Sequence, residues 1–170
     1  MISEADRVNK AWDKIEAWFA KNDPTAKLNP GASASDIHDL ETKINLTIPE
    51  DLKVSLLRHN GVADPYWPKG NLNSIEEIIR EWEGWADMEE DEMADAGPKD
   101  NEYIQPYFWS KLWIPIDADG AGNGAVVDTN PGPKGKVGQV LHFDHGMGPS
   151  GPLFPSFADY LEDACDSLGK

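Results

Sequence analysis

The stretch from Trp113 to Val140 alternates short apolar runs with residues that form turns. The runs are separated by Gly, Asp and Asn, which tolerate a positive φ angle and close tight turns. This alternation predicts an antiparallel meander with strands near 114–116, 124–128 and 139–143. The stretch carries no nucleophile next to a base, so we interpret it as a recognition scaffold and not as an active site.

Amphipathic helices are predicted on both sides of this meander. Apolar residues recur at three- and four-residue spacing in four segments before the meander and in one after it. Ser3, Ser35, Ser74 and Ser156 are the expected N-caps, and Pro49 opens the remaining helix. Residues 144–155 are rich in Gly and Pro and predict a loop. Helices followed by strands and then a helix favour the α+β class, and a chain of 170 residues fits a single domain.

The charge of the chain is strongly negative, with 15 basic and 31 acidic residues and a net charge of −16. This sign disfavours nucleic acid and anionic membrane surfaces as partners. Ten of the acidic residues and one basic residue, Arg80, lie between Glu76 and Asp95. Two interpretations remain open, namely a solvated face that keeps the protein soluble and a surface that attracts a cationic partner.

The single cysteine, Cys165, excludes an internal disulfide framework and suits a reducing compartment. The first residues lack the basic-then-apolar pattern of a secretory signal, and no apolar run reaches the length of a bilayer span. We therefore expect a cytoplasmic protein without a membrane partner. The position of Cys165 on the apolar side of the last helix favours burial over a nucleophilic role.

Part of the meander resembles a calcium loop, with Asp117, Asp119, Gly122 and Asp128 at the first, third, sixth and twelfth positions. The fifth position is Ala121, which offers no side-chain ligand, and Asp128 is shorter than the usual glutamate. The alternative interpretation is a glycine-rich hairpin whose side chains satisfy turn amides. We favour the hairpin and expect no metal.

A second candidate for chemistry is the group His142, Asp144 and His145. Two histidines with no further ligand nearby are more typical of a turn than of a metal or acid–base site. The chain has no Gly-x-Ser-x-Gly, phosphate loop or His-Glu-x-x-His motif. We therefore expect no catalytic residues and no cofactor, and a metal-dependent enzyme is the least favoured class.

The order of several short motifs resembles the SUKH superfamily, which includes yeast-type cell-wall-synthesis regulators and many bacterial immunity proteins. The motifs are Leu28-Asn29-Pro30-Gly31, Ile48-Pro49-Glu50-Asp51-Leu52, His59-Asn60-Gly61, Trp113-Ile114-Pro115, Asp119-Gly120-Ala121-Gly122-Asn123 and Gly138-Gln139-Val140. The resemblance covers nearly the whole chain and implies one domain, residues 1–170. It also implies helices packed around a twisted, largely antiparallel sheet, a C-terminal helix and no catalysis. The chain departs from the family in an acidic stretch, expected to be a helical insertion at about 83–99.

The resemblance leads to two hypotheses about function. The favoured one is a non-enzymatic immunity protein that binds and neutralises a cognate bacterial toxin with a basic face, such as a nuclease. The alternative is a regulatory protein–protein interaction module of the cell-wall or signalling type, with a resident cellular partner. For the favoured hypothesis, Trp67 or Trp85 is the expected anchor, because tryptophan is enriched at binding hot spots. The acidic residues expected to face the partner are Glu81, Glu83, Asp87, Glu89, Glu90, Asp91 and Glu92.

Overall fold

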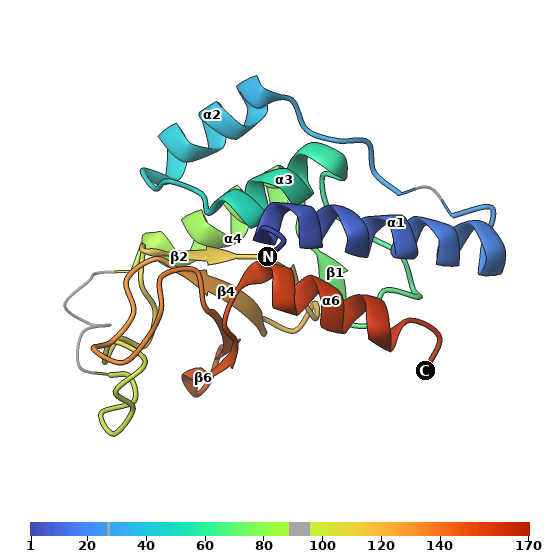
Figure 1. Ribbon diagram of the computed structural model, residues 1–170. Coiled ribbons are helices and arrows are strands. Elements are labelled where there is room, and N and C mark those ends of the chain that lie inside the picture. Colours follow the sequence, from blue (N-terminus) through green and yellow to red (C-terminus); the bar gives the residue numbers. More distant parts are fainter. Residues whose placement is uncertain (27, 89–95) are drawn as a thin grey trace.

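The computed structural model describes residues 1–26, 28–88 and 96–170, and it confirms the α+β class (Figure 1). Helices α1 and α6 lie side by side, and α2 and α3 lie on the other side of α1 from α6. The helices within the described ranges are α1 (Glu4–Asn22), α2 (Ala34–Ile44), α3 (Glu50–Arg58), α4 (Ile75–Ala86) and α6 (Phe157–Ser167).

The strands form two antiparallel sheets within the same ranges. One has four strands in the order β2-β4-β5-β6, and the other pairs β1 with β3. Their bounds are β1 (Asn71–Leu72), β2 (Trp113–Pro115), β3 (Asp117–Ala118), β4 (Gly124–Asp128), β5 (Val140–Asp144) and β6 (Gly148–Phe154). The predicted meander is confirmed, because its three strands are β2, β4 and β5 and they are antiparallel neighbours.

Strand β6 shows that one prediction was wrong, because residues 144–155 were predicted to form a loop. Its two prolines, Pro149 and Pro152, lack the amide hydrogen that a strand interior normally donates. Strand β6 pairs only with β5, so it lies at the edge of the sheet. An edge strand has one neighbour instead of two, and it therefore tolerates prolines that a central strand would not.

Helix N-termini follow local capping signals. The side chains of three predicted caps each accept a hydrogen bond from the amide three residues later; these caps are Ser3, Ser74 and Ser156. Helix α2 is capped by Ser33 and not, as predicted, by Ser35. Asp36 explains the shift, because its carboxylate accepts a 2.8 Å hydrogen bond from the Ser33 amide and completes a reciprocal capping box. Ser35 is followed three residues later by His38, which has no carboxylate.

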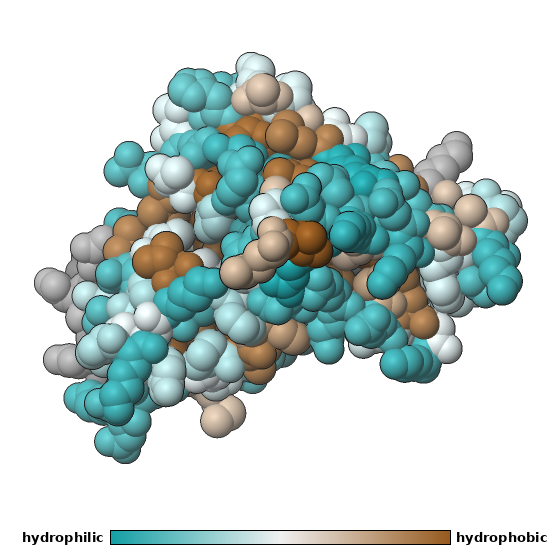
Figure 2. Space-filling model, viewed as in Figure 1, coloured by the Kyte–Doolittle hydropathy of each residue, from teal (hydrophilic) through white to brown (hydrophobic). Residues whose placement is uncertain are grey.

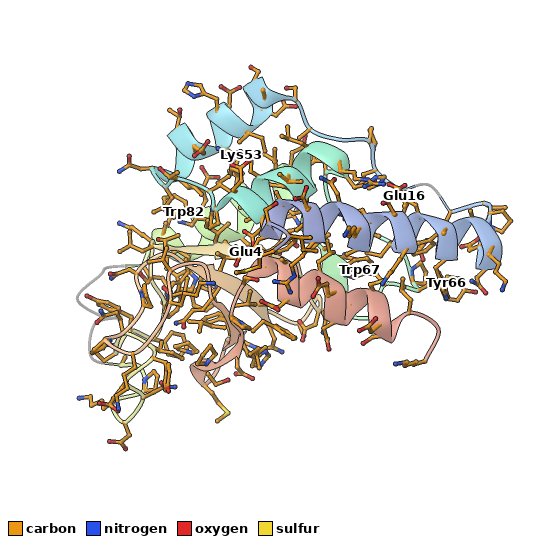
Figure 3. All side chains as sticks on the ribbon, viewed as in Figure 1. Glu4, Glu16, Lys53, Tyr66, Trp67 and Trp82 are labelled. Carbon is orange, nitrogen blue, oxygen red and sulfur yellow. The ribbon has the colours of Figure 1, made fainter. Side chains whose placement is uncertain are left out.

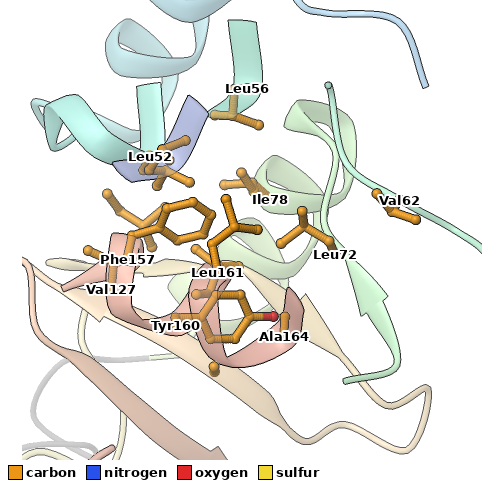
Figure 4. Packing of buried hydrophobic residues seen from close by; sticks show 14 of the residues in the cluster. Leu52, Leu56, Val62, Leu72, Ile78, Val127, Phe157, Tyr160, Leu161 and Ala164 are labelled. Carbon is orange, nitrogen blue, oxygen red and sulfur yellow. The ribbon is translucent and has the colours of Figure 1, made fainter. Parts of the chain in front are cut away.

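The four-stranded sheet is covered on both faces. The main core lies on one face, where Leu52 of α3 and Phe157 and Leu161 of α6 pack near Val127 of β4 (Figure 4). Adjacent residues of a strand point to opposite faces, so Val126 belongs to a second apolar cluster. The buried members of this second cluster are Ile104, Trp109, Trp113, Val126, Leu141 and Phe143. Burial on both faces explains why the strands read as continuous apolar runs.

The outer surface seen in Figure 2 is mostly hydrophilic, with smaller hydrophobic patches between the polar regions. Across the described ranges, no helix is both long enough and apolar enough to span a bilayer. Residues 83–86 of the predicted acidic insertion belong to α4, whereas 89–95 lie outside the described residues. The insertion at 83–99 therefore stays a prediction.

Candidate binding pocket

A pocket of about 230 Å³ lies between α4 and the hairpin that joins β3 to β4, and we call it the α4 pocket. Helix α4 contributes Glu81 and Trp85, which are four residues apart and therefore lie on the same face of the helix. The hairpin contributes Asp117 and Asn123 among other residues, and Arg80 is exposed at the border. Two predicted partner-binding residues thus line one cavity.

The base of the α4 pocket is aromatic. The Trp85 ring meets Phe143 edge-on with 5.0 Å between ring centroids, and it stacks on Trp109 at 6.4 Å with 17° between the ring planes. Phe143 and Trp109 are both buried members of the second apolar cluster. Trp85 is half-buried, so its ring is held by packing while part of it stays accessible.

Glu81 is a half-buried carboxylate in the wall of this pocket. Its Oε2 atom accepts a 3.2 Å hydrogen bond from Asn73 Nδ2. Burial, with a smaller contribution from the charges of Glu77 and Asp117, raises the pKa of Glu81 to about 7 despite Asn73 and the nearby Arg80. At neutral pH the pocket therefore contains a carboxyl group that is partly protonated.

Asp117 is a buried carboxylate that links the hairpin to α6. Its Oδ2 atom accepts a 2.7 Å hydrogen bond from the Tyr160 hydroxyl, and its Oδ1 atom accepts one of 2.5 Å from the Ala125 amide. Burial raises the pKa of Asp117. Both oxygens have internal partners, so Asp117 orders the hairpin and adds negative charge beside the pocket.

The other carboxylates of the calcium-like pattern have separate partners. Asp119 Oδ1 accepts hydrogen bonds from the amides of Ala121 and Asn123, at 2.7 and 3.1 Å. Asp128 Oδ2 accepts a 2.9 Å hydrogen bond from Gln139 Nε2. This arrangement is the glycine-rich hairpin that was the favoured interpretation. The described residues contain no cluster of three or more histidine, cysteine or acidic side chains arranged to hold a metal ion.

The second candidate site, the group His142, Asp144 and His145, also makes hydrogen bonds within turns. Asp144 Oδ1 accepts hydrogen bonds from the amides of Gly146 and Met147, and these hydrogen bonds, the one from Gly146 above all, lower the pKa of Asp144. The Nδ1 atom of His145 lies 2.9 Å from Asn123 Oδ1. The Asp144 contacts close the turn between β5 and β6, and the His145 contact joins this turn to the hairpin between β3 and β4. Cys165 is half-buried in α6, and burial raises the pKa of its thiol.

Trp67 was predicted to contact a partner, but the structure places it in the core. Its side chain is 3% exposed and stacks on Trp12 of α1, with 6.0 Å between ring centroids and 19° between planes. Figure 3 shows Trp67 inside the molecule, whereas the neighbouring Tyr66 lies near the surface and is 55% exposed. The loop folds back onto α1, so the indole of Trp67 fills the core and is not presented to a partner.

Of the acidic candidates that the structure describes, only Glu81 lines the α4 pocket. Glu83 Oε1 pairs with Lys43 Nζ at 2.8 Å, which ties α4 to α2. Asp87 is exposed and caps the C-terminus of α4. The remaining candidates lie outside the described residues; they are Glu89, Glu90, Asp91 and Glu92. Among the described candidates, only Glu81 and Trp85 share a cavity.

Sequence reasoning missed the pocket contributions of Arg80, Trp109, Asp117 and Phe143. One local signal pointed to the site, namely the four-residue spacing of Glu81 and Trp85 on a helix. Apart from Arg80, which is on α4, the other described lining residues come from 109–143, and only the tertiary fold brings them against α4.

The amino-acid sequence of this chain is similar to those of known regulatory proteins. The SMI1/KNR4 family (SUKH-1) matches residues 31–163. The chain is 27% identical to the glucan synthesis regulatory protein of Neurospora crassa, over 96% of this chain and 38% of that protein. It is 30% identical to the cell wall biosynthesis/cell cycle regulator smi1 of Schizosaccharomyces pombe, over 91% of this chain and 34% of that protein. It is 21% identical to the cell wall assembly regulator SMI1 of Saccharomyces cerevisiae, over 93% of this chain and 40% of that protein.

These similarities correct the favoured functional hypothesis. The relatives are named as fungal regulators of glucan or cell-wall synthesis, so the expectation of a bacterial toxin-immunity protein is wrong. The alternative hypothesis, a regulatory interaction module, agrees better with them. The chain spans 34 to 40% of the length of these three relatives.

Proposed function

Because this chain belongs to the SMI1/KNR4 family (SUKH-1), we propose that it is a non-enzymatic regulatory module that binds a protein partner in the control of cell-wall synthesis. The observation that carries the proposal is the similarity to named wall and glucan regulators over more than 90% of the chain. The family is one of regulators, which supports a role in binding.

The local chemistry supports a binding role in a second way. Two buried carboxylates beside the meander are occupied by internal hydrogen bonds. Asp117 is held by Tyr160 and Ala125, and Asp128 is held by Gln139. A general acid or base must reach the proton it transfers, and groups engaged in this way serve the fold instead. The α4 pocket remains as a preformed, partly aromatic recess on the surface.

A chimera tests the proposal directly. In Neurospora crassa, the segment of the glucan synthesis regulatory protein that matches this chain is replaced by residues 1–170, and wall glucan is measured. A strain that lacks the segment serves as the reference. We expect the chimera to restore wall glucan most of the way from the deletion level to the native level.

The expression of each chimera is checked by immunoblot, and folding of the inserted chain is checked on the purified protein. A folded chimera that is present at native levels, yet leaves wall glucan at the deletion level, would refute the proposed function. As a control, an unrelated acidic domain of similar length is inserted in the same place and is expected to restore nothing.

A further inference from the structure

We propose that the α4 pocket binds an arginine side chain of the partner protein, with the guanidinium held between the Glu81 carboxylate and the Trp85 ring. The inference rests on the proposed function, because it assigns the chemistry by which that module recognises its partner. It concerns a site within the described residues.

The first argument is the charge of the pocket wall. Glu81 and Asp117 both line the cavity, and neither forms a salt bridge with a described residue. Glu81 uses Oε2 to accept from Asn73, whereas Oε1 has no hydrogen bond to a described residue. A half-buried carboxylate without an ion-pair partner is destabilised even with Arg80 nearby, and a cation from a partner in direct contact would relieve this cost.

The second argument is the aromatic base. Cations bind over the faces of aromatic rings, and tryptophan is the most favourable of them. A guanidinium is planar and weakly hydrated, so it stacks on an indole while it donates hydrogen bonds to a carboxylate. Trp85 and Glu81 lie one helical turn apart and both line the pocket. The packing of Trp85 against Trp109 and Phe143 holds the ring in place before binding.

The third argument is size. Pockets that bind drug-sized ligands have volumes of about 300 to 1,000 Å³. The α4 pocket has about 230 Å³, which suits a single inserted side chain better than a whole small molecule. The net charge of −16 also attracts a basic segment from a distance and favours encounter with it.

An anionic group is the wrong occupant for this pocket. Of the described residues that line it, Arg80 is the one with a basic side chain, and it is exposed. An anion that reached the aromatic base would approach Glu81 and Asp117, which carry the same charge. The same two carboxylates should attract a charged arginine more strongly than a neutral group of equal shape. The test uses this difference in affinity.

The test compares two capped tripeptides, N-acetyl-Gly-Arg-Gly-amide and its citrulline analogue, which has nearly the same shape but no charge. Binding to the full chain is followed by NMR, from the chemical shifts of the tryptophan indole N–H groups. We expect the arginine peptide to bind about tenfold more tightly than the citrulline peptide and to shift the Trp85 signal. Equal affinities, or an arginine peptide that fails to shift Trp85, would overturn the proposal.

Two variants show whether the pocket itself is responsible. Glu81→Gln keeps the size of the side chain and is expected to weaken arginine binding about tenfold. Glu83→Gln removes the same charge two residues away, at the ion pair with Lys43, and is expected to change the affinity less than about twofold. Equal losses in both variants would mean that general electrostatic attraction is responsible, and the assignment to the pocket would be wrong.

The dependence on pH provides a further check. The charged groups that act on Glu81 are Arg80 and Glu77 of the same helix and Asp117 of β3. Because the pKa of Glu81 is about 7, arginine binding should tighten as the pH rises through neutrality and Glu81 ionises. The Glu81→Gln variant should lack this dependence. Arginine affinity that is the same at pH values below and above 7 would contradict the role of Glu81.

The inference and the proposed function can fail separately. If the chimera restores wall glucan but a chimera with Glu81→Gln restores it equally, the pocket assignment is wrong and the regulatory role stands. If the arginine peptide binds as expected but the chimera restores nothing, the pocket binds arginine and the proposed role in wall synthesis is wrong.

Discussion

The Tyr160 hydroxyl donates a 2.7 Å hydrogen bond to Asp117 Oδ2, although the two residues are 43 positions apart. This contact joins α6 to β3, the strand that leads into the hairpin of the α4 pocket. Lys69 lies over the Tyr160 ring, 5.5 Å from its centroid, and pairs with Asp163 at 2.6 Å. The position of the hairpin therefore depends on a buried polar contact as well as on apolar packing.

Replacement of Tyr160 by phenylalanine should lower the free energy of unfolding by about 1 to 3 kcal/mol, because one oxygen of buried Asp117 loses its donor. Urea denaturation measures this loss. Tyr66→Phe is the matched control, since Tyr66 is 55% exposed and its hydroxyl has no hydrogen bond to a described residue. Equal stability of the two variants would show that the Tyr160 contact contributes little.

Asp51 makes a comparable link between α3 and α6. It is 4% exposed, and it accepts hydrogen bonds from the Leu52 amide at 2.9 Å and the Ala158 amide at 3.0 Å. Asp51→Ala leaves both amides without this acceptor and should cost about 2 kcal/mol of unfolding free energy. Glu50→Ala, at the exposed neighbouring position, should change it by less than about 0.5 kcal/mol. Thermal or urea unfolding with similar losses for both variants would argue against the link.

Glu81 should make stability depend on pH. In the unfolded chain its carboxyl group ionises near its ordinary value of 4.5, whereas in the folded protein its pKa is about 7. The folded state therefore binds more protons between these values, and its stability falls as the pH rises through this range. Above pH 7 the full cost of a charged, half-buried carboxylate is present.

The Glu81→Gln variant isolates this effect from the other acidic residues. We compare the free energy of unfolding of the variant with that of the wild-type protein at each pH. The variant minus wild-type difference should be about 2 kcal/mol larger at pH 8 than at pH 5. Urea denaturation at both pH values measures the difference, and Glu83→Gln provides the control at an ion-paired site. A difference that does not change with pH would mean that Glu81 ionises normally in the folded protein.

Trp67 should behave as a core residue. Its side chain is 3% exposed against Trp12, so Trp67→Ala should lower the unfolding free energy by about 3 to 5 kcal/mol. Tyr66→Ala changes a side chain that is 55% exposed and should cost less than about 1 kcal/mol. A stable Trp67→Ala variant would restore the interpretation of Trp67 as a surface anchor. Differential scanning calorimetry distinguishes the two outcomes.

The helices and the meander could be predicted because their signals are local. Ser74 and Glu77 form a reciprocal capping box whatever surrounds them, and the glycines of the hairpin permit the turn between β3 and β4. Strand β6 was missed for the same reason. Pro149 and Pro152 argue against a strand locally, and only the position at the edge of the sheet makes them acceptable.

The candidate site could be predicted only in part. Trp85, one of the two expected anchors, is half-buried and lines the α4 pocket. Trp67 was the other expected anchor, yet the loop folds back and buries it. Burial depends on which surfaces meet after folding, and neighbouring residues in the chain carry little information about that.

The sequence by itself determined the α+β class, three of the four predicted serine caps and the negative charge, because each depends on composition or on residues within about four positions. Only the tertiary structure decided that Glu81 would sit beside Asp117 and above an aromatic base, and that Glu83 would turn away to pair with Lys43. The physical reason is that solvent exclusion sets the pKa of a carboxylate and the accessibility of a ring, and both arise from contacts between distant segments.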